Sequence, residues 1–188
     1  MFYPLPDTQE QFEISLPDLL ASRDARQARQ QEWIGLHQVT LISFTVVFPG
    51  PVKDSQLVRD IFNQGLNALK QVASCRQWVL LSQQSFPLVT GPECLVAVEA
   101  DAIEVKKALM DAEELSPVGR LWDFDVFDKN GVLYSRSQFN LPTRRCLICD
   151  NEAKVCARQR SHSLDEILHR IKELAYVPAT HRSTNYVK

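Results

Sequence analysis

The chain has 188 residues, with 21 Lys and Arg against 23 Asp and Glu, a formal net charge of −2 and a hydrophobic fraction of 45%. These values are typical of one soluble folded domain, and they exclude disordered and collagen-like classes and a broad nucleic-acid-binding surface. The longest apolar run, residues 39–48, is shorter than the roughly 20 residues of a transmembrane helix. The N-terminus has no basic stretch followed by an apolar one. We therefore expect a cytoplasmic protein, with neither a membrane nor a nucleic acid as partner.

The first predicted element is a helix over residues 15–33, which Ser15 is placed to cap. Within it, Arg23, Arg26 and Arg29 recur every three residues and form one basic flank. Such a flank is either a solvated surface or a docking face for an anionic ligand or an acidic partner.

Residues 39–127 predict strands and helices in the order strand, helix, strand, strand, helix, strand. The apolar β-branched runs and the helical spacing place strands at 39–48, 77–83, 94–100 and 120–127, and helices at 55–74 and 101–116. This order is that of the ferredoxin-like βαββαβ unit. The predicted fold class is therefore α+β with a ferredoxin-like core. The turn at 128–131 (DKNG) predicts an added hairpin strand over 132–136.

The chain is expected to form one domain spanning residues 1–188, with the α+β core over residues 39–136. Its C-terminal part, residues 141–175, is expected to form a Cys/Arg-rich helical subdomain. A last helix begins at Ser163, with Glu166 three residues on in a capping box. The tail from residue 176 is polar and aperiodic, and we expect it to fray.

Two carboxylates stand two positions apart in residues 119–126, GRLWDFDV. Strand alternation puts Asp123 and Asp125 on one face, with Trp122 and Phe124 on the other. Two like charges on a half-buried strand repel each other, so the pair favours a counter-cation such as Mg²⁺. The alternative is the solvent face of an edge strand, where paired acids are harmless.

Positive charge is concentrated after this strand. Residues 136–160 contain six basic residues and only two acidic ones, although the whole chain is slightly acidic. Arginine predominates, and its planar guanidinium binds phosphate bidentately. The candidate phosphate ligands are Arg120, Arg136, Arg144, Arg145, Arg158 and Arg160. Paired carboxylates near arginines are typical of phosphoryl or nucleotidyl transfer.

Three of the five cysteines lie in one short segment with a histidine. Cys146, Cys149, Cys156 and His162 are a reasonable set of tetrahedral zinc ligands, with a CxxC first pair. Alternatively, the cysteines are small apolar packing residues and His162 helps to bind phosphate. The sequence leaves both interpretations open.

Four separated segments together resemble one family. These are residues 19–30 (LLASRDARQARQ), 43–53 (SFTVVFPGPVK), 119–126 (GRLWDFDV) and 141–162 (LPTRRCLICDNEAKVCARQRSH). In this order they resemble the apo-citrate lyase phosphoribosyl-dephospho-CoA transferases, also called holo-citrate lyase synthases.

The resemblance implies a nucleotidyltransferase that moves phosphoribosyl-dephospho-CoA from triphosphoribosyl-dephospho-CoA to a serine of the acyl carrier (gamma) subunit of citrate lyase, with release of pyrophosphate. Asp123 and Asp125 would then be catalytic and hold Mg²⁺, and the arginines would bind the triphosphate. Arg23 and Arg26 fall in the first family segment, which favours their role in docking the carrier. The alternative function is a non-catalytic zinc-bearing module that binds an anionic partner.

Overall fold

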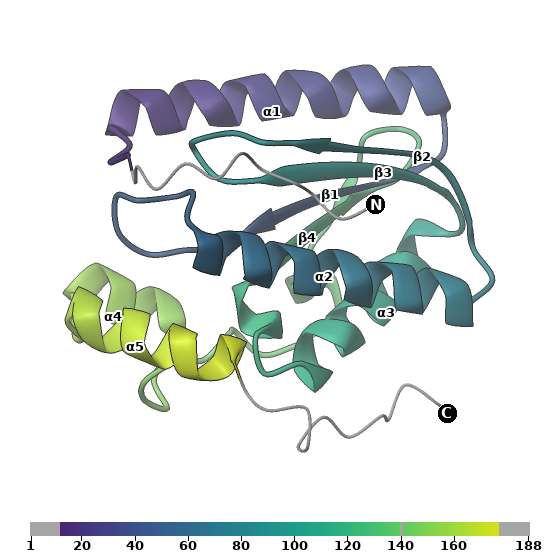
Figure 1. The fold of residues 1–188 in the computed structure, drawn as a ribbon. Coiled ribbons are helices and arrows are strands. Elements are labelled where there is room, and N and C mark those ends of the chain that lie inside the picture. The colour runs from purple at the N-terminus through teal and green to yellow at the C-terminus, as the bar shows by residue number, and fades with distance from the viewer. Residues whose placement is uncertain (1–11, 140, 177–188) are drawn as a thin grey trace.

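The computed structural model describes residues 12–139 and 141–176, which form five α-helices and one five-stranded antiparallel sheet (Figure 1). The α+β prediction is therefore confirmed. The helices are α1 (Leu16–His37), α2 (Gln56–Cys75), α3 (Ala102–Leu115), α4 (Ala153–Gln159) and α5 (Leu164–Ala175). The strands are β1 (Thr40–Val46), β2 (Val79–Phe86), β3 (Glu93–Glu99), β4 (Trp122–Phe127) and β5 (Leu133–Tyr134). Two short 3₁₀ helices span Gly119–Leu121 and Arg136–Phe139.

Polar caps fix where the helices begin. The side chains of Ser15, Ser55 and Asp101 accept hydrogen bonds from backbone amides in the first turns of α1, α2 and α3. Ser163 and Glu166 form the predicted capping box at the start of α5. Each cap occupies a backbone donor that the first helical turn leaves free, so local sequence was sufficient to locate these helix starts.

Several elements differ from the prediction, among them β2, which spans Val79–Phe86 and not residues 77–83. Helix α1 continues to His37, because Trp33 is buried on the sheet and the chain leaves the helix only at Gln38, which has a left-handed φ of 53°. The short helix α4 was not predicted. The returning hairpin strand, predicted over 132–136, contains only two residues, because Arg136 turns away to pair with Glu113 of α3.

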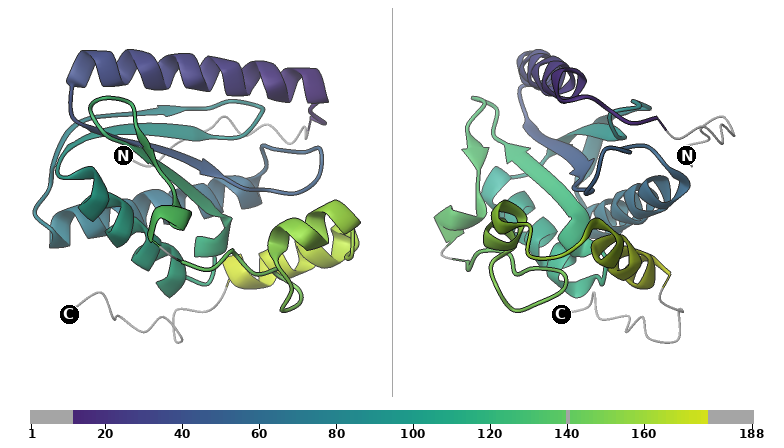
Figure 2. Two further views of the ribbon diagram at one scale, coloured as in Figure 1. Left: turned by 180° about the vertical axis from the view of Figure 1, so that it is seen from behind. Right: turned by 90° about the vertical axis from the view of Figure 1, so that its left-hand side faces the viewer.

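The sheet has the strand order β2-β3-β1-β4-β5, with every neighbouring pair antiparallel. Helices α2 and α3 cover one face and α1 lies across the other (Figures 1 and 2). The α2–α3 face holds the main core, where the Phe44 ring stacks on Phe62 and Phe124 with centroids 4.9 and 4.4 Å apart. Gly65 of α2 allows this packing, since a Cβ there would lie 2.3 Å from the Phe44 ring.

The α1 face is only partly apolar. Its small core consists of Trp33 with Leu41, Leu95 and Ala97, next to the C-terminal half of α1. Near the N-terminal half of α1 the sheet instead presents hydroxyl and carboxyl side chains. This polar part of the face is where the candidate site lies.

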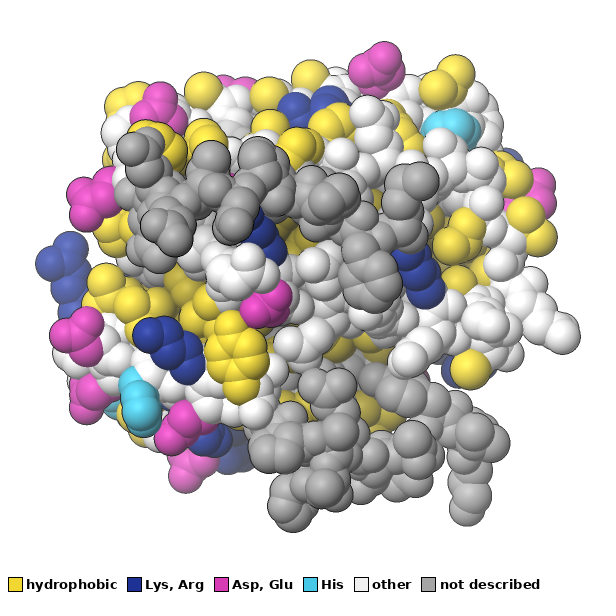
Figure 3. Space-filling view, in the orientation of Figure 1, with side chains coloured by type: hydrophobic (Ala, Val, Ile, Leu, Met, Phe, Trp, Pro, Cys, Tyr) yellow, Lys and Arg dark blue, Asp and Glu magenta, His cyan; other side chains and the backbone are white. Residues whose placement is uncertain are grey.

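Helix α5 packs against α2. Its residues Ile171 and Ala175 belong to the main core, and Gln64 of α2 donates to the Ala175 carbonyl over 3.3 Å. Charges of both signs are mixed over the α4–α5 end of the molecule (Figure 3). The tail that was expected to fray lies almost entirely outside the described residues. Among the helices of the described ranges, none combines the length and hydropathy needed to cross a bilayer.

Candidate active site

The paired aspartates lie on β4 as alternation predicts. Asp123 and Asp125 face α1 and are partly exposed, whereas Trp122 and Phe124 are buried in the core on the opposite face. In the register with β1, Asp123 stands opposite Thr45 and Asp125 opposite Ser43. The pair is therefore not on the open solvent face of an edge strand, because α1 crosses this face of the sheet (Figure 2).

The electrostatic environment of Asp125 favours a nearby cation. Burial raises the pKa of the Asp125 carboxyl, and the like charge of Asp123 raises it further. Lys106, Arg26 and Arg144 act in the opposite direction without cancelling the rise. Keeping Asp125 ionised therefore costs free energy, and a bound cation would lower this cost.

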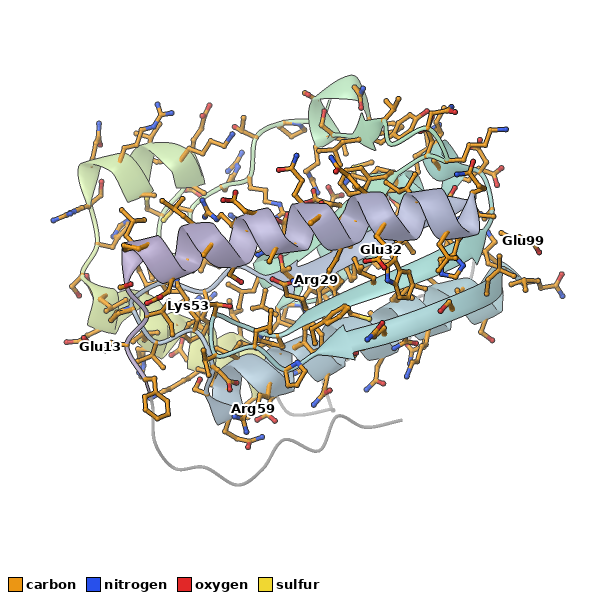
Figure 4. The ribbon with its side chains drawn as sticks, turned by 90° about the horizontal axis from the view of Figure 1, so that it is seen from above. Glu13, Arg29, Glu32, Lys53, Arg59 and Glu99 are labelled. Carbon is orange, nitrogen blue, oxygen red and sulfur yellow. The ribbon has the colours of Figure 1, made fainter. Side chains whose placement is uncertain are left out.

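A polar pocket opens between the N-terminal half of α1 and the sheet. Its volume is about 210 Å³, and Asp123 forms part of its wall. Three cations, Arg23, Arg26 and Lys53, also line it, together with Thr45, Thr90 and Glu93. Seen from above, Lys53 lies beside the N-terminal half of α1 (Figure 4). The pocket therefore combines hydroxyl groups and positive charge with a carboxylate of the aspartate pair, a set suited to a metal-bound phosphate.

Lys53 is held in place by the loop before it. Its Nζ donates to the Phe48 carbonyl over 2.6 Å. Burial lowers the pKa of Lys53, and the neighbouring Arg23 lowers it further. Two cations that face each other in this way gain from an anion placed between them.

The basic flank of α1 is divided between two environments. Arg23 is exposed at the pocket, whereas Arg26 and Arg29 turn inward to Glu93 of β3. The Glu93 side chain is only 4% exposed, and its Oε1 lies 2.9 Å from Arg26 Nε. Arg29 lies between α1 and the strands (Figure 4). Arg26 and Arg29 therefore fasten α1 to the sheet, and Arg26 also reaches the pocket wall.

A second group of cations surrounds Glu113 of α3, whose side chain is 3% exposed. Its Oε2 accepts from Arg136 over 2.9 Å and from Arg144 over 2.7 Å. Arg120 lies close to both arginines but has no carboxylate partner among the described residues, and its Nη1 donates to the Cys146 carbonyl over 3.5 Å. The Arg120 Nε is buried with no hydrogen-bond partner in the described structure. We refer to Arg120, Arg136 and Arg144 as the arginine cluster.

The other predicted phosphate ligands lie apart from this cluster. Arg145 pairs with Asp150 on the surface, where both side chains are largely exposed. Arg158 is exposed near the end of α4, and Arg160 is exposed at its C-cap. Of the six arginines, the structure thus brings three together, and the roles of the other three as phosphate ligands stay predictions.

The cysteine segment converges on one point. The Sγ of Cys149 lies 3.5 Å from the Sγ of Cys156 and 3.3 Å from Nε2 of His162. With Cys146 included, the four ligand atoms all lie within 4.8 Å of one another. These side chains could hold one metal ion. The interpretation of the cysteines as separate packing residues does not account for this convergence.

Lys53, Thr45 and Thr90 were not predicted as site residues. They come from β1 and from two loops, and only the sheet pairing brings them next to Asp123. Lys53 and Thr45 do lie in the segment 43–53 that carries the family resemblance. That segment could have pointed to Lys53 and Thr45 as site residues, but it indicated only the family resemblance.

Comparison with known proteins identifies the family. The family model for apo-citrate lyase phosphoribosyl-dephospho-CoA transferase matches residues 14–176. The chain belongs to this family. Proteins of that name from Shigella boydii serotype 18 and Escherichia coli O157:H7 are each 44% identical to it over 170 residues, which is 90% of this chain and 93% of theirs. The match includes the aspartate pair, the pocket, the arginine cluster and the Cys₃His group.

Proposed function

We propose that this protein transfers the phosphoribosyl-dephospho-CoA group from triphosphoribosyl-dephospho-CoA to a serine of the acyl carrier subunit of citrate lyase. The observation that carries the proposal is the family match over residues 14–176, at 44% identity to relatives bearing that name. A polar pocket lined by three cations and by the carboxylates of Asp123 and Glu93 is consistent with a polyphosphate donor. We infer that the reaction takes place in the cytoplasm.

In the proposed reaction the serine Oγ bonds to the phosphorus next to the ribose. The bond from that phosphorus to the bridging oxygen breaks, and pyrophosphate leaves with the electron pair. The serine proton passes to a base, for which Asp123 and Asp125 are the candidates on this face of the sheet. Negative charge grows on the leaving pyrophosphate, so cations fixed around it lower the barrier.

We assign the pyrophosphate end of the donor to the pocket. Arg23 and Lys53 would neutralise its oxygens, and the Thr45 and Thr90 hydroxyls would donate to them. A volume of about 210 Å³ is below the roughly 300–1,000 Å³ of pockets that enclose a drug-sized ligand. The pocket therefore suits a phosphate chain, with the rest of the donor lying outside it.

Mg²⁺ fits the aspartate pair. Asp123 and Asp125 provide two oxygen ligands on one face, and burial with like-charge repulsion makes a cation favourable there. Asp123 and Asp125 would hold Mg²⁺, and its charge would stabilise the negative charge that grows on the phosphate groups during transfer.

Zn²⁺ fits the Cys₃His group. Tetrahedral zinc with bonds of about 2.3 Å to sulfur needs ligand atoms about 3.8 Å apart, and the Cys149 contacts of 3.3 and 3.5 Å are close to that separation. Cys146 Sγ also accepts a hydrogen bond from the Ile148 amide over 3.5 Å, which favours a thiolate. All four positions are filled by side chains, so this would be a structural site.

Two finer predictions remain part of the proposal. The order β1-α2-β2-β3-α3-β4 supports a ferredoxin-like core with an added hairpin strand and a C-terminal Cys/Arg-rich extension. Arg23 and Arg26, at the pocket beside α1, would attract an acidic carrier. Complementary charge there would raise the rate of encounter more than the final affinity.

Steady-state kinetics of pyrophosphate release test the proposal. With apo carrier, donor and Mg²⁺, we expect one pyrophosphate to be released per carrier modified. Asp123→Asn should lower kcat at least about 100-fold, as loss of a key transition-state contact does. Lys53→Met should raise the KM for the donor by about tenfold, whereas Lys129→Met, on the exposed hairpin turn, should change nothing. Binding of donor without pyrophosphate release would instead favour the non-catalytic module.

A further inference from the structure

The segment that carries the Cys₃His group has almost no hydrophobic core. Among described residues 141–163, only Cys156 is buried. Short segments with so little buried apolar surface generally need a disulfide or a metal to hold one conformation. All cysteines in the described residues are free, so a metal is the remaining cross-link.

Backbone hydrogen bonds join the metal-binding turn to Arg144. The Cys146 amide donates to the Asn151 carbonyl over 2.7 Å, and the Ala153 amide donates to the Arg144 carbonyl over 2.8 Å. The CxxC turn, the start of α4 and the backbone of Arg144 therefore form one unit. A metal that fixes the turn would also fix the position of Arg144.

Arg120 depends on the same unit. Its Nη1 donates to the carbonyl of the metal ligand Cys146, and its Nε is buried without a partner among the described residues. Arg144 is shared with Glu113, whose Oε1 is also buried and unpaired. The arginine cluster thus has three guanidinium groups against two carboxylates, buried Glu113 and exposed Glu114, with buried and unsatisfied Nε atoms on Arg120 and Arg136. This excess of partly buried positive charge suits an anion.

We propose that Zn²⁺ bound by Cys146, Cys149, Cys156 and His162 holds Arg120 and Arg144 in a second anion-binding subsite, which takes a phosphate group of the donor. Asp125 lies within electrostatic reach of Arg26 at the pocket and of Arg144 in the cluster. Both subsites therefore lie near Asp125. The donor carries phosphates on its ribose and within its dephospho-CoA part, so it offers one anionic group to each. Zinc acts here by positioning, and the inference rests on the proposed function for the identity of the anion.

Metal content tests the first half of this inference. Protein purified without chelators should contain about one zinc ion per chain, measured by inductively coupled plasma mass spectrometry. Cys149→Ser should lose it, and Cys75→Ser, an exposed cysteine on α2 outside the group, should retain it. Replacement by Co²⁺ should give the visible absorption of a tetrahedral thiolate site. Absence of zinc from the wild-type protein, or equal zinc in both variants, would overturn the metal site.

Calorimetric binding of dephospho-CoA, which lacks the triphosphate assigned to the pocket, tests the second half without using activity. Cys149→Ser and Arg120→Ala should each weaken dephospho-CoA binding by about tenfold, whereas Cys75→Ser and the exposed Arg76→Ala should leave it unchanged. The double variant should bind no more weakly than either single variant, because both changes remove the same contact. Additive losses of affinity in the double variant would indicate a general structural effect and would overturn the positioning role. Unchanged binding in Cys149→Ser would overturn it as well.

The proposed function fails in a different way. If zinc and zinc-dependent dephospho-CoA binding are present but no group reaches the carrier, the subsite stands and the transferase assignment is wrong. If transfer occurs and is unaffected by loss of zinc, the transferase assignment stands and the zinc-dependent subsite is wrong.

Discussion

Replacing Asp125 by Asn should make the Mg²⁺-free protein more stable at pH 7. Burial and the like charge of Asp123 raise the pKa of Asp125 above its unfolded value. A carboxyl with a raised folded pKa costs stability once the pH exceeds that pKa, and costs nothing below the unfolded pKa of about 3.9. Asn keeps the shape of the side chain and removes the charge. The gain should therefore be full at pH 7 and shrink as the pH falls towards 4.

The size of the gain follows from the strand geometry. Side chains two positions apart on a strand are about 7 Å apart, and two unit charges at that distance repel by about 2 kcal/mol at an effective dielectric constant of about 20. Lys106, Arg26 and Arg144 attract the same carboxylate, so this repulsion is the upper limit of the gain. For a domain of this size that corresponds to about 4–8 °C in Tm. Asp24→Asn, on the exposed face of α1, is a matched control and should change stability by less than about 0.5 kcal/mol.

Thermal unfolding with and without Mg²⁺ is the assay. Mg²⁺ at 100 times its Kd should raise the free energy of unfolding of the wild-type protein by up to about 2.7 kcal/mol, and its Tm should rise accordingly. The Tm of Asp125→Asn should rise much less. Chelators are to be avoided, because they would also remove zinc. If Asp125→Asn were less stable than the wild type at pH 7 without Mg²⁺, the repulsion argument would fail. An equal response of both proteins to Mg²⁺ would refute the metal assignment.

Two further substitutions test the packing that positions the site. Glu93→Gln leaves two arginines of α1 facing a neutral, buried side chain and should cost about 3 kcal/mol in urea unfolding; a loss below 1 kcal/mol would mean that α1 is held by other contacts. Gly65→Ala forces a Cβ to within 2.3 Å of the Phe44 ring and should cost about 1–3 kcal/mol by overpacking. Gly35→Ala, with nothing within 4 Å of the added Cβ, should instead stabilise the protein by up to about 1 kcal/mol.

Local signals predicted most of the fold. The caps at Ser15, Ser55, Asp101 and Ser163 are short-range hydrogen bonds, so the residues that form them are visible in the sequence. Strand alternation likewise placed Asp123 and Asp125 on one face. The elements that the sequence did not predict correctly are short ones: helix α4 has seven residues, and β5 has only two. In such short elements, tertiary contacts outweigh intrinsic preference.

The long-range part of the site could not be predicted in the same way. The sequence indicated a positively charged region after β4, but charge counting does not reveal that Glu113 of α3 accepts from both Arg136 and Arg144. Lys53 is separated from Asp123 by 70 positions, and only the β1–β4 pairing and the following loop bring it to the pocket. Sequence patterns therefore indicated the carboxylates, arginines and cysteines of the site, whereas the tertiary structure determines how they are grouped and adds Lys53, Thr45 and Thr90.

Intact-mass measurement of the carrier tests directly whether this protein is the transferase. Apo acyl carrier subunit, verified as folded, is incubated with this protein, Mg²⁺ and triphosphoribosyl-dephospho-CoA. The carrier should gain the mass of one phosphoribosyl-dephospho-CoA group on a serine, with one pyrophosphate released per carrier. A carrier of unchanged mass, with a donor that a known transferase of this family can use, would contradict the transferase assignment.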